Sequence, residues 1–209
     1  MKKKILELLI CPACLPEEQD LNPHIKEEKE NDIVEGILSC TRCGREYPIK
    51  SGIAFLDPNS LHKIHNAPSK YEEAPALASY LWSHYGDLLE DENATAAYQD
   101  WNNLMRPSSG VAIDAGSAVG RFTFELSQKS DFAIGIDNSL SFIRAARELM
   151  LAREKEVQLQ QEGHVIRKAT ITLPKIWKSG NTEFLVADAQ RLPFKSGSFS
   201  SLASLNLVD

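Results

Sequence analysis

The sequence predicts an α/β protein in which a parallel sheet follows a small β domain held together by four cysteines. Three apolar runs that each end in an acidic residue predict buried parallel strands, whose carboxyl ends meet at one edge of a sheet. These runs are 111–113 before Asp114, 132–136 before Asp137 and 184–187 before Asp188. All four cysteines lie at or before position 43, which marks the N-terminal part as a separate unit.

The composition excludes several classes of protein. Of the 209 residues, 43% are hydrophobic and 25% are charged, as in ordinary globular proteins. The net charge of −6 gives no overall attraction to nucleic acid, although a local basic face would still permit an RNA substrate. The apolar run 5–10 is interrupted by Glu7 and followed by no cleavage site, and no run approaches the roughly 18 residues of a membrane span. We therefore predict a cytoplasmic protein without a membrane partner.

The four cysteines form two Cys-x-x-Cys pairs, Cys11 with Cys14 and Cys40 with Cys43. Two such pairs supply the four thiolates of a tetrahedral zinc site. Two disulfides or two redox pairs are the alternative, which a reducing compartment and the placement of both pairs in one small domain disfavour. We predict a structural zinc ion, because four protein ligands leave no open coordination position for chemistry.

The sequence around the cysteines predicts a zinc-ribbon domain over 1–57, a linker over 58–70 and a second domain over 71–209. The charged stretch 26–32 is expected to be a solvated hairpin tip, and 33–39 the strand that leads into the second cysteine pair. The linker contains His62 and His65, which we interpret as surface histidines rather than metal ligands.

Residues 71–105 have a helical pattern that breaks at Gly86 and is rich in aromatic side chains. Two interpretations stay open: these helices cover a ligand and contact a substrate, or they pack on the sheet through an aromatic stripe. Ser139 is expected to cap a helix that continues to a C-cap near Gly163. The β-branched stretch 165–173 then predicts either an insertion that shapes a substrate pocket or a plain additional hairpin.

The stretch 111–121 predicts the strand, glycine turn and helix of a nucleotide-binding βαβ unit. Gly116 and Gly120 would let the backbone pass close to a ligand. Asp137 follows at nearly the offset of about 20 residues expected for an acid that binds a ribose. The spacing Gly-x-Gly-x-x-Gly is absent, which argues against the competing interpretation as a dinucleotide oxidoreductase.

From about residue 80 to 209 the chain resembles the class I S-adenosylmethionine-dependent methyltransferases. Asp-Ala-Gly-Ser-Ala-Val-Gly at 114–120 is similar to their first motif and Ile-Asp-Asn at 136–138 to their second. Ala-Asp-Ala-Gln-Arg-Leu-Pro-Phe at 187–194 is similar to the third. Ala118 stands where a glycine is common, and Ser200 where an acid is usual. The resemblance implies a Rossmann-like methyltransferase sheet that binds S-adenosylmethionine as a methyl donor.

The resemblance also implies roles for single residues. Asp137 would hold the ribose hydroxyls, the glycine turn would approach the methionine moiety, and Asp188 would contact the adenine edge. The cofactor-binding residues that it implies are Asp114, Gly116, Ser117, Gly120, Asp137, Asn138, Ala187, Asp188, Ala189 and Asn206. It identifies no catalytic base. The phrase 118–126 is also similar to methyltransferases that act on small thiol-histidine metabolites.

Nearly all of residues 1–57 resemble the small zinc-ribbon activator subunit of tRNA, rRNA and translation-factor methyltransferases. Leu-Leu-Ile-Cys-Pro-Ala-Cys at 8–14 and the segment 40–53 carry this resemblance. In that family the ribbon stabilises a methyltransferase and supplies no catalytic group. Two functions therefore stay open: a methyltransferase acting on a small metabolite, an RNA or a protein, or a non-catalytic adaptor or activator with a degenerate nucleotide fold.

The sequence stops at Asp209, where the fourth strand of the sheet is expected to end. The expected strand order is therefore 3-2-1-4, a C-terminally incomplete sheet with strand 4 at its edge. An exposed edge strand tends to pair with another chain. We expect a fragment of a longer enzyme, or a homodimer or other partner that covers this edge.

Overall fold

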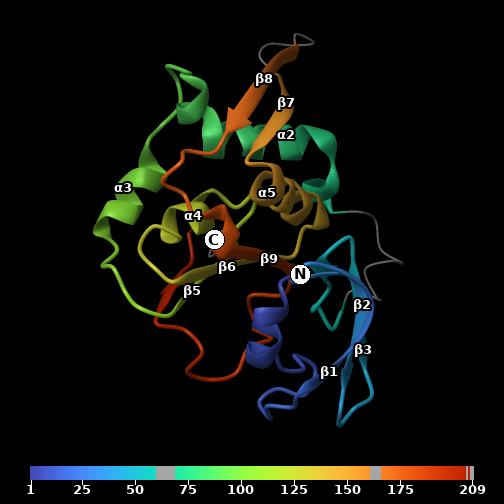
Figure 1. Cartoon of the computed structure of the whole chain (residues 1–209). Coiled ribbons are helices and arrows are strands. Elements are labelled where there is room, and N and C mark those ends of the chain that lie inside the picture. Colours follow the sequence, from blue (N-terminus) through green and yellow to red (C-terminus); the bar gives the residue numbers. More distant parts are fainter. Residues whose placement is uncertain (60–68, 161–165, 206, 208–209) are drawn as a thin grey trace.

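The computed structural model describes residues 1–59, 69–160, 166–205 and 207 and centres on a four-stranded parallel sheet (Figure 1). Its strands are β5 (Val111–Ala115), β6 (Phe132–Asp137), β9 (Thr182–Val186) and β10 (Ser201–Ala203). Their order is β10-β5-β6-β9, which is the predicted order 3-2-1-4. The chain reverses its direction of progress at β5, so a crevice opens between the carboxyl ends of β5 and β10.

One face of this sheet carries helices α4 (Arg121–Leu126) and α5 (Leu140–Ala152). Outside them lie η2 (Lys70–Glu72), α2 (Ala74–Tyr85), η3 (Gly86–Leu89) and α3 (Ala97–Leu104) (Figure 1). The predicted break at Gly86 is confirmed, because α2 ends at the preceding residue. None of the described helices has the length and apolarity needed to cross a membrane.

The predicted start of α5 is confirmed, whereas its predicted end is wrong. The Ser139 hydroxyl accepts a hydrogen bond of 3.2 Å from the Phe142 amide, so it caps the helix. The helix stops at Ala152 because Arg153 adopts a left-handed conformation, with φ of 63°. The Arg153 guanidinium donates to backbone carbonyls of the segment 173–177, which holds this turn in place. Gly163, the expected end, lies outside the described residues.

The segment after Arg153 forms strand β7 (Glu154–Gln160), which pairs with β8 (Ile166–Thr172) in an antiparallel hairpin. An additional hairpin is one of the two interpretations made for 165–173, although its partner strand was expected to be helical. Alternate residues of the hairpin, among them Val157 and Ile171, are buried in a cluster that includes Leu81 of α2. The hairpin therefore packs on α2 (Figure 1).

The N-terminal region contains η1 (Lys3–Leu8) and an antiparallel sheet in the order β1-β2-β3-β4. Its strands are β1 (Leu21–Lys29), β2 (Asp32–Cys40), β3 (Glu46–Lys50) and β4 (Ile53–Ala54). Strands β1 and β2 form the predicted hairpin, whose tip around Glu30 is exposed. Strand β2 ends at Cys40 and so leads into the second cysteine pair, as predicted.

This N-terminal region, residues 1–57, which we call the ribbon, covers the second face of the parallel sheet (Figure 1). Successive side chains of a strand point to opposite faces. One set from the parallel sheet, including Ile113, Ile134 and Leu185, shares a buried cluster with ribbon residues such as Ile5 and Tyr47. The boundaries at 57 and 71 stay predictions, but the two regions share one hydrophobic core.

Backbone hydrogen bonds join the ribbon to the parallel sheet along two lines. The amide of Leu56 donates to the carbonyl of Val186 at 2.7 Å, so the ribbon runs beside the end of strand β9. The amide of Ile10 donates to Pro193 at 3.0 Å, and the amide of Lys195 donates to Leu8 at 2.9 Å. The chain that follows β9 is therefore paired with the ribbon.

A buried ion-pair network crosses the same junction. Arg147 of α5 pairs with Glu183 of β9 and with Asp32 of the ribbon, and the Met1 ammonium lies 2.8 Å from Asp32. Arg147 and Glu183 are both buried. Gly52, with φ of +76°, passes so close that an added Cβ would overlap the guanidinium of Arg147. The Arg147 guanidinium thus links helix α5, strand β9 and the ribbon.

Arg147→Met is expected to reduce the free energy of unfolding by about 3–5 kcal/mol, because it leaves Glu183 buried without its charged partner. Arg144→Met, an exposed position on the same helix, is expected to change it by less than about 0.5 kcal/mol. Urea unfolding measures both. Adding Glu183→Gln to Arg147→Met should recover part of the lost stability. Equal stability of Arg147→Met and Arg144→Met would contradict the role given to the ion-pair network.

Candidate functional site

A cavity of about 550 Å³ lies at the carboxyl ends of β5 and β6. This volume falls within the range of roughly 300–1,000 Å³ of small-molecule sites. Its floor is the turn after β5 with the end of β6, one side is the segment after β10, and helices α2 and α3 form the opposite wall. The cavity therefore occupies the crevice that the strand order creates.

The glycine turn forms the part of the cavity nearest to β5. Gly116 has φ of +82°, and a Cβ there would lie 2.9 Å from Leu207, so the turn requires glycine. The amides of Gly116 and Ser117 both donate to the carbonyl of Ile136 at 2.9 Å, which ties the turn to β6. The buried Ser117 hydroxyl has no hydrogen-bond partner among the described residues. The turn thus presents one polar group with its bonding capacity unused.

Asp137 closes the turn from the end of β6. Its two oxygens accept hydrogen bonds from the amides of Ala118 at 3.0 Å and Ser139 at 2.8 Å. Burial raises the pKa of this carboxyl, although these amides oppose the shift. A carboxylate has about four lone-pair sites. Asp137 can therefore hold the turn and also accept hydrogen bonds from hydroxyl groups of a ligand.

Asp114 lies at the bottom of the cavity and is buried. Thr123 of α4 donates to its carboxylate at 2.8 Å, so Asp114 fastens the start of α4 to the end of β5. Burial raises the pKa of Asp114 to about 7, and the charge of Asp137 acts in the same direction. Two carboxyl groups in one cavity whose described lining has no lysine or arginine make it favourable for positive charge.

The structure brings together Asp114, Gly116, Ser117, Asp137 and Asn138 as cavity-lining residues. Gly120 lies beside the cavity rather than in its lining. A Cβ on Gly120 would be 2.8 Å from Ala146 and from Phe184, so close packing of α4 against α5 and β9 accounts for this glycine.

The residues of the third motif and Asn206 are not among the described lining residues. Ala187 is buried in the core shared with the ribbon. Asp188 accepts a hydrogen bond of 2.9 Å from the amide of Gln190 and so caps its own turn. Ala189 packs partly against the same core. Asn206 lies outside the described residues. Their roles at the cofactor stay predictions.

The wall of the cavity is aromatic and agrees with both interpretations of the helices before β5, because Tyr80 lines the cavity and also packs against a buried core cluster. Trp101, Tyr98, His84, Tyr80 and Phe142 follow one another with centroid separations of 5.2, 4.6, 5.6 and 4.5 Å. Tyr80, Tyr98 and Trp101 belong to the aromatic-rich segment 71–105. Tyr71, at the start of that segment, and Phe142 of α5 also line the cavity. No sequence signal distinguishes Phe142 from a core aromatic.

Two contacts fix this wall to the glycine turn and the helix that follows it. The Tyr85 hydroxyl donates to the carbonyl of Val119 at 2.8 Å. Arg121 of α4 is buried, forms a two-pronged ion pair with Asp87 of η3 and also pairs with Glu125. The helical segment over the cavity is thus bound to the same turn that would meet a ligand.

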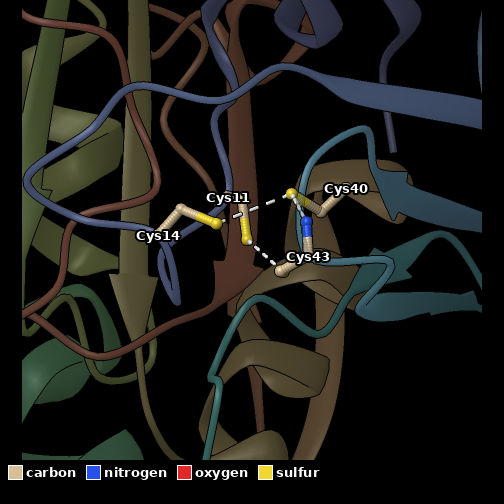
Figure 2. Close-up of side chains that lie close together, drawn as sticks. All are labelled: Cys11, Cys14, Cys40 and Cys43. Atoms are coloured by element: carbon tan, nitrogen blue, oxygen red, sulfur yellow. Dashed lines mark hydrogen bonds between the residues drawn. The ribbon is translucent and has the colours of Figure 1, made fainter.

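The four cysteines, at positions 11, 14, 40 and 43, form a second site. Figure 2 shows their side chains turned toward one another from two segments of the ribbon. All four sulfurs lie within 4.8 Å of one another. Cys11 and Cys43 are 3.8 Å apart and Cys14 and Cys40 are 3.7 Å apart, measured between sulfurs. Zinc–sulfur bonds of about 2.3 Å in a tetrahedron place sulfurs about 3.8 Å apart, whereas a disulfide needs about 2.05 Å. The arrangement fits a metal ion.

Hydrogen bonds to the sulfurs complete this cluster. The amides of Arg42 and Cys43 both lie 3.4 Å from the Cys40 sulfur, and the Tyr47 hydroxyl lies 3.2 Å from the Cys11 sulfur. Donors of this kind orient thiolate ligands and stabilise their charge. Tyr47 is buried in the core shared with the parallel sheet, so the cluster is connected directly to that core.

Residues 2–52 match the family described as Trm112p-like protein. This match covers most of the ribbon and none of the parallel sheet, in agreement with the resemblance seen in the sequence. A comparison of the chain with curated proteins gave no match.

Solved structures with a similar fold include methyltransferases. One is phosphoethanolamine N-methyltransferase 1 of Haemonchus contortus, with 19% identity, TM-score 0.42 and coverage of 65% of this chain and 23% of that one. A protein of Methanococcus maripaludis described as an S-adenosyl-L-methionine-dependent methyltransferase has 13% identity, TM-score 0.43 and coverage of 68% and 54%. A further match is a chain from the complex between the Haloferax volcanii Trm112 methyltransferase activator and a methyltransferase. It has 15% identity, TM-score 0.38 and coverage of 66% of this chain and 48% of that one. The chain thus spans about a quarter to about half of these structures, and at these scores the functional argument rests on the site itself.

Asp114→Asn is expected to change how stability depends on pH. Because the pKa of Asp114 is raised in the folded state, the folded protein binds the proton more tightly and loses stability as pH rises from about 4 to about 7. An amide can still accept from Thr123 and does not ionise. Above pH 7 the variant should therefore be more stable, by at most about 4 kcal/mol.

Urea unfolding at pH 4.5 and pH 8 tests this expectation. Asp100→Asn, at an exposed position of α3, is the control and should follow the wild-type profile. Parallel pH profiles for the wild-type protein and Asp114→Asn would show that Asp114 has an ordinary pKa.

Proposed function

We propose that this chain is an S-adenosylmethionine-dependent methyltransferase in which the zinc-binding ribbon supports the catalytic sheet. The observation that carries the proposal is the cavity at the switch point of the sheet. There the glycine turn and the Asp137 carboxylate lie side by side. Small-molecule ligands of open α/β sheets bind in this position.

The chain's own residues suit the donor in specific ways. Asp137 keeps acceptor capacity for the two ribose hydroxyls, and Asn138 lies next to it in the lining. Gly116 leaves room for the methionine moiety, and Ser117 offers an unpaired hydroxyl. Ala187, Asp188 and Ala189 are proposed to contact the adenine edge, and Asn206 to lie near the acceptor side. The donor supplies an activated methyl group on sulfur, and the protein contributes positioning.

Asp137→Asn is expected to weaken binding of S-adenosylmethionine about 10- to 100-fold, because hydrogen bonds to a charged acceptor contribute roughly 1.5–3 kcal/mol. Isothermal titration of the zinc-loaded protein measures the affinity. Asp100→Asn, exposed and outside the lining, should bind like the wild-type protein. Absence of binding by the folded wild-type protein, or equal affinities for all three proteins, would remove the proposed cofactor site.

Zinc is proposed as the metal of the cysteine cluster, with Cys11, Cys14, Cys40 and Cys43 as its ligands. The distances between the sulfurs fit tetrahedral coordination, and a closed four-thiolate site is structural. Because Cys11 and Cys40 belong to the core that the ribbon shares with the parallel sheet, zinc would stabilise both regions. Cysteines that bind a metal rather than form disulfides agree with the proposed cytoplasmic location.

Cys14→Ser is expected to remove zinc binding and to lower the stability of the cofactor-binding region together with that of the ribbon. Trp177 reports on the latter region, because it is buried against Phe124 and far in sequence from the ribbon. Metal content and the thermal unfolding midpoint followed by tryptophan fluorescence test this. Glu17→Gln, an exposed position near the cluster, serves as the control. An unchanged midpoint in Cys14→Ser would show that the metal supports the ribbon alone.

A second candidate function is a non-catalytic activator of another methyltransferase. The Trm112p-like match over residues 2–52 favours it, as does the lack of an identified catalytic base. Strand β10 lies at the edge of the sheet with Leu202 exposed, where a second copy or another protein is proposed to pair. Methyl transfer from labelled donor to any acceptor by the purified chain separates the two functions.

A further inference from the structure

We propose that the methyl acceptor is a small amine, methylated on nitrogen and held against the aromatic wall of the cavity. This inference rests on the proposed methyltransferase function and names the substrate class of the same site. It follows from the shape of the wall, from the charges that line the cavity and from how charge moves during methyl transfer.

The wall of the cavity contains a continuous series of aromatic rings that contact one another. The rings of Tyr98 and His84 are tilted by 36° with centroids 4.6 Å apart, and Trp101 meets Tyr98 edge-on at 5.2 Å. The negative faces of aromatic rings attract ammonium groups by about 0.5–2 kcal/mol each. Burial lowers the pKa of His84 to about 3, so this ring is neutral and does not repel a cation.

The charged residues of the lining have one sign. Asp114 and Asp137 contribute carboxyl groups, whereas the described lining residues include neither lysine nor arginine. Arg121 lies 5.9 Å from the Tyr98 ring centroid, but Asp87 and Glu125 neutralise its charge. An acceptor that carries a carboxylate or phosphate beside the donor would find no lysine or arginine among the described lining residues to replace its hydration.

The movement of charge during the reaction suits the same lining. The amine reacts in its uncharged form, after its ammonium proton has passed to water. Its lone pair attacks, a nitrogen–carbon bond forms, and the sulfur–carbon bond breaks with its electron pair remaining on sulfur. One positive charge thus passes from the sulfonium to the ammonium and stays inside the cavity. An anionic acceptor would instead cancel this charge. Aromatic faces and two carboxyl groups stabilise a single cation before and after transfer.

The volume limits the size of the acceptor. The cavity of about 550 Å³ has to hold the donor as well as the reacting part of the acceptor. A small amine fits the space that the donor leaves and needs no basic partner. A nucleotide would need basic partners for its phosphate, and the described lining residues include none.

The test compares three probes of the same shape: choline, its neutral analogue 3,3-dimethylbutan-1-ol and the anion 3,3-dimethylbutanoate. Of the three tryptophans, Trp101 lines the cavity, so quenching of its fluorescence reports binding. Each probe is titrated with and without saturating S-adenosylhomocysteine. Choline is expected to bind at least about 10-fold more tightly than the alcohol, and the anion more weakly than both.

Variants at Tyr98 separate the ring from its hydroxyl, which lies 2.7 Å from His84. Tyr98→Leu is expected to weaken choline binding about 10-fold and to leave binding of the alcohol nearly unchanged. Tyr98→Phe keeps the ring and should weaken choline binding less. With labelled donor, the wild-type protein should methylate N,N-dimethylethanolamine and not the anion.

The outcomes distinguish this inference from the function on which it rests. Failure to bind S-adenosylhomocysteine would overturn the proposed methyltransferase. Binding of S-adenosylhomocysteine together with equal affinity for choline and the alcohol, or with tighter binding of the anion, would overturn the amine acceptor alone. The titrations of the three probes without S-adenosylhomocysteine measure the preference of the cavity for cations whether or not S-adenosylhomocysteine binds.

Discussion

Both faces of a parallel sheet have to be covered, and helices α4 and α5 cover only one face of the sheet in this chain. The ribbon covers the other, and the buried Arg147 joins the ribbon to the sheet through Asp32 and Glu183. The carboxyl ends of the strands keep their positions only while this layered arrangement holds. We therefore expect the glycine turn and Asp137 to depend on residues that lie far from the cavity.

Those parts of the site that belong to strand ends could be predicted from the sequence. Asp114 and Asp137 follow apolar runs, and the alignment of parallel strands brings such residues to one edge whatever covers the sheet. The cysteine cluster could be predicted equally well, because two Cys-x-x-Cys pairs leave few ways to bring four sulfurs together. In both cases a local pattern is enough to determine the geometry.

Other features depend on contacts that no local pattern encodes. The helical periodicity before Arg153 does not show that its guanidinium finds carbonyl partners about twenty residues later, which ends α5 and starts a hairpin. The apolar strands show that both sheet faces are buried, but not that the ribbon buries one of them. The third motif illustrates the same limit, because Phe194 pairs with Leu9 of the ribbon and directs the chain after β9 toward it.

The shared core has a consequence for how this protein behaves on dilution. Two separate chains that covered each other in this way would dissociate as their concentration fell, with a midpoint set by their affinity. Here the contact is made within one polypeptide, where a tether keeps the effective concentration of the second surface high at any dilution. The supporting layer and the layer it supports are therefore present in equal numbers in every molecule, from synthesis onward.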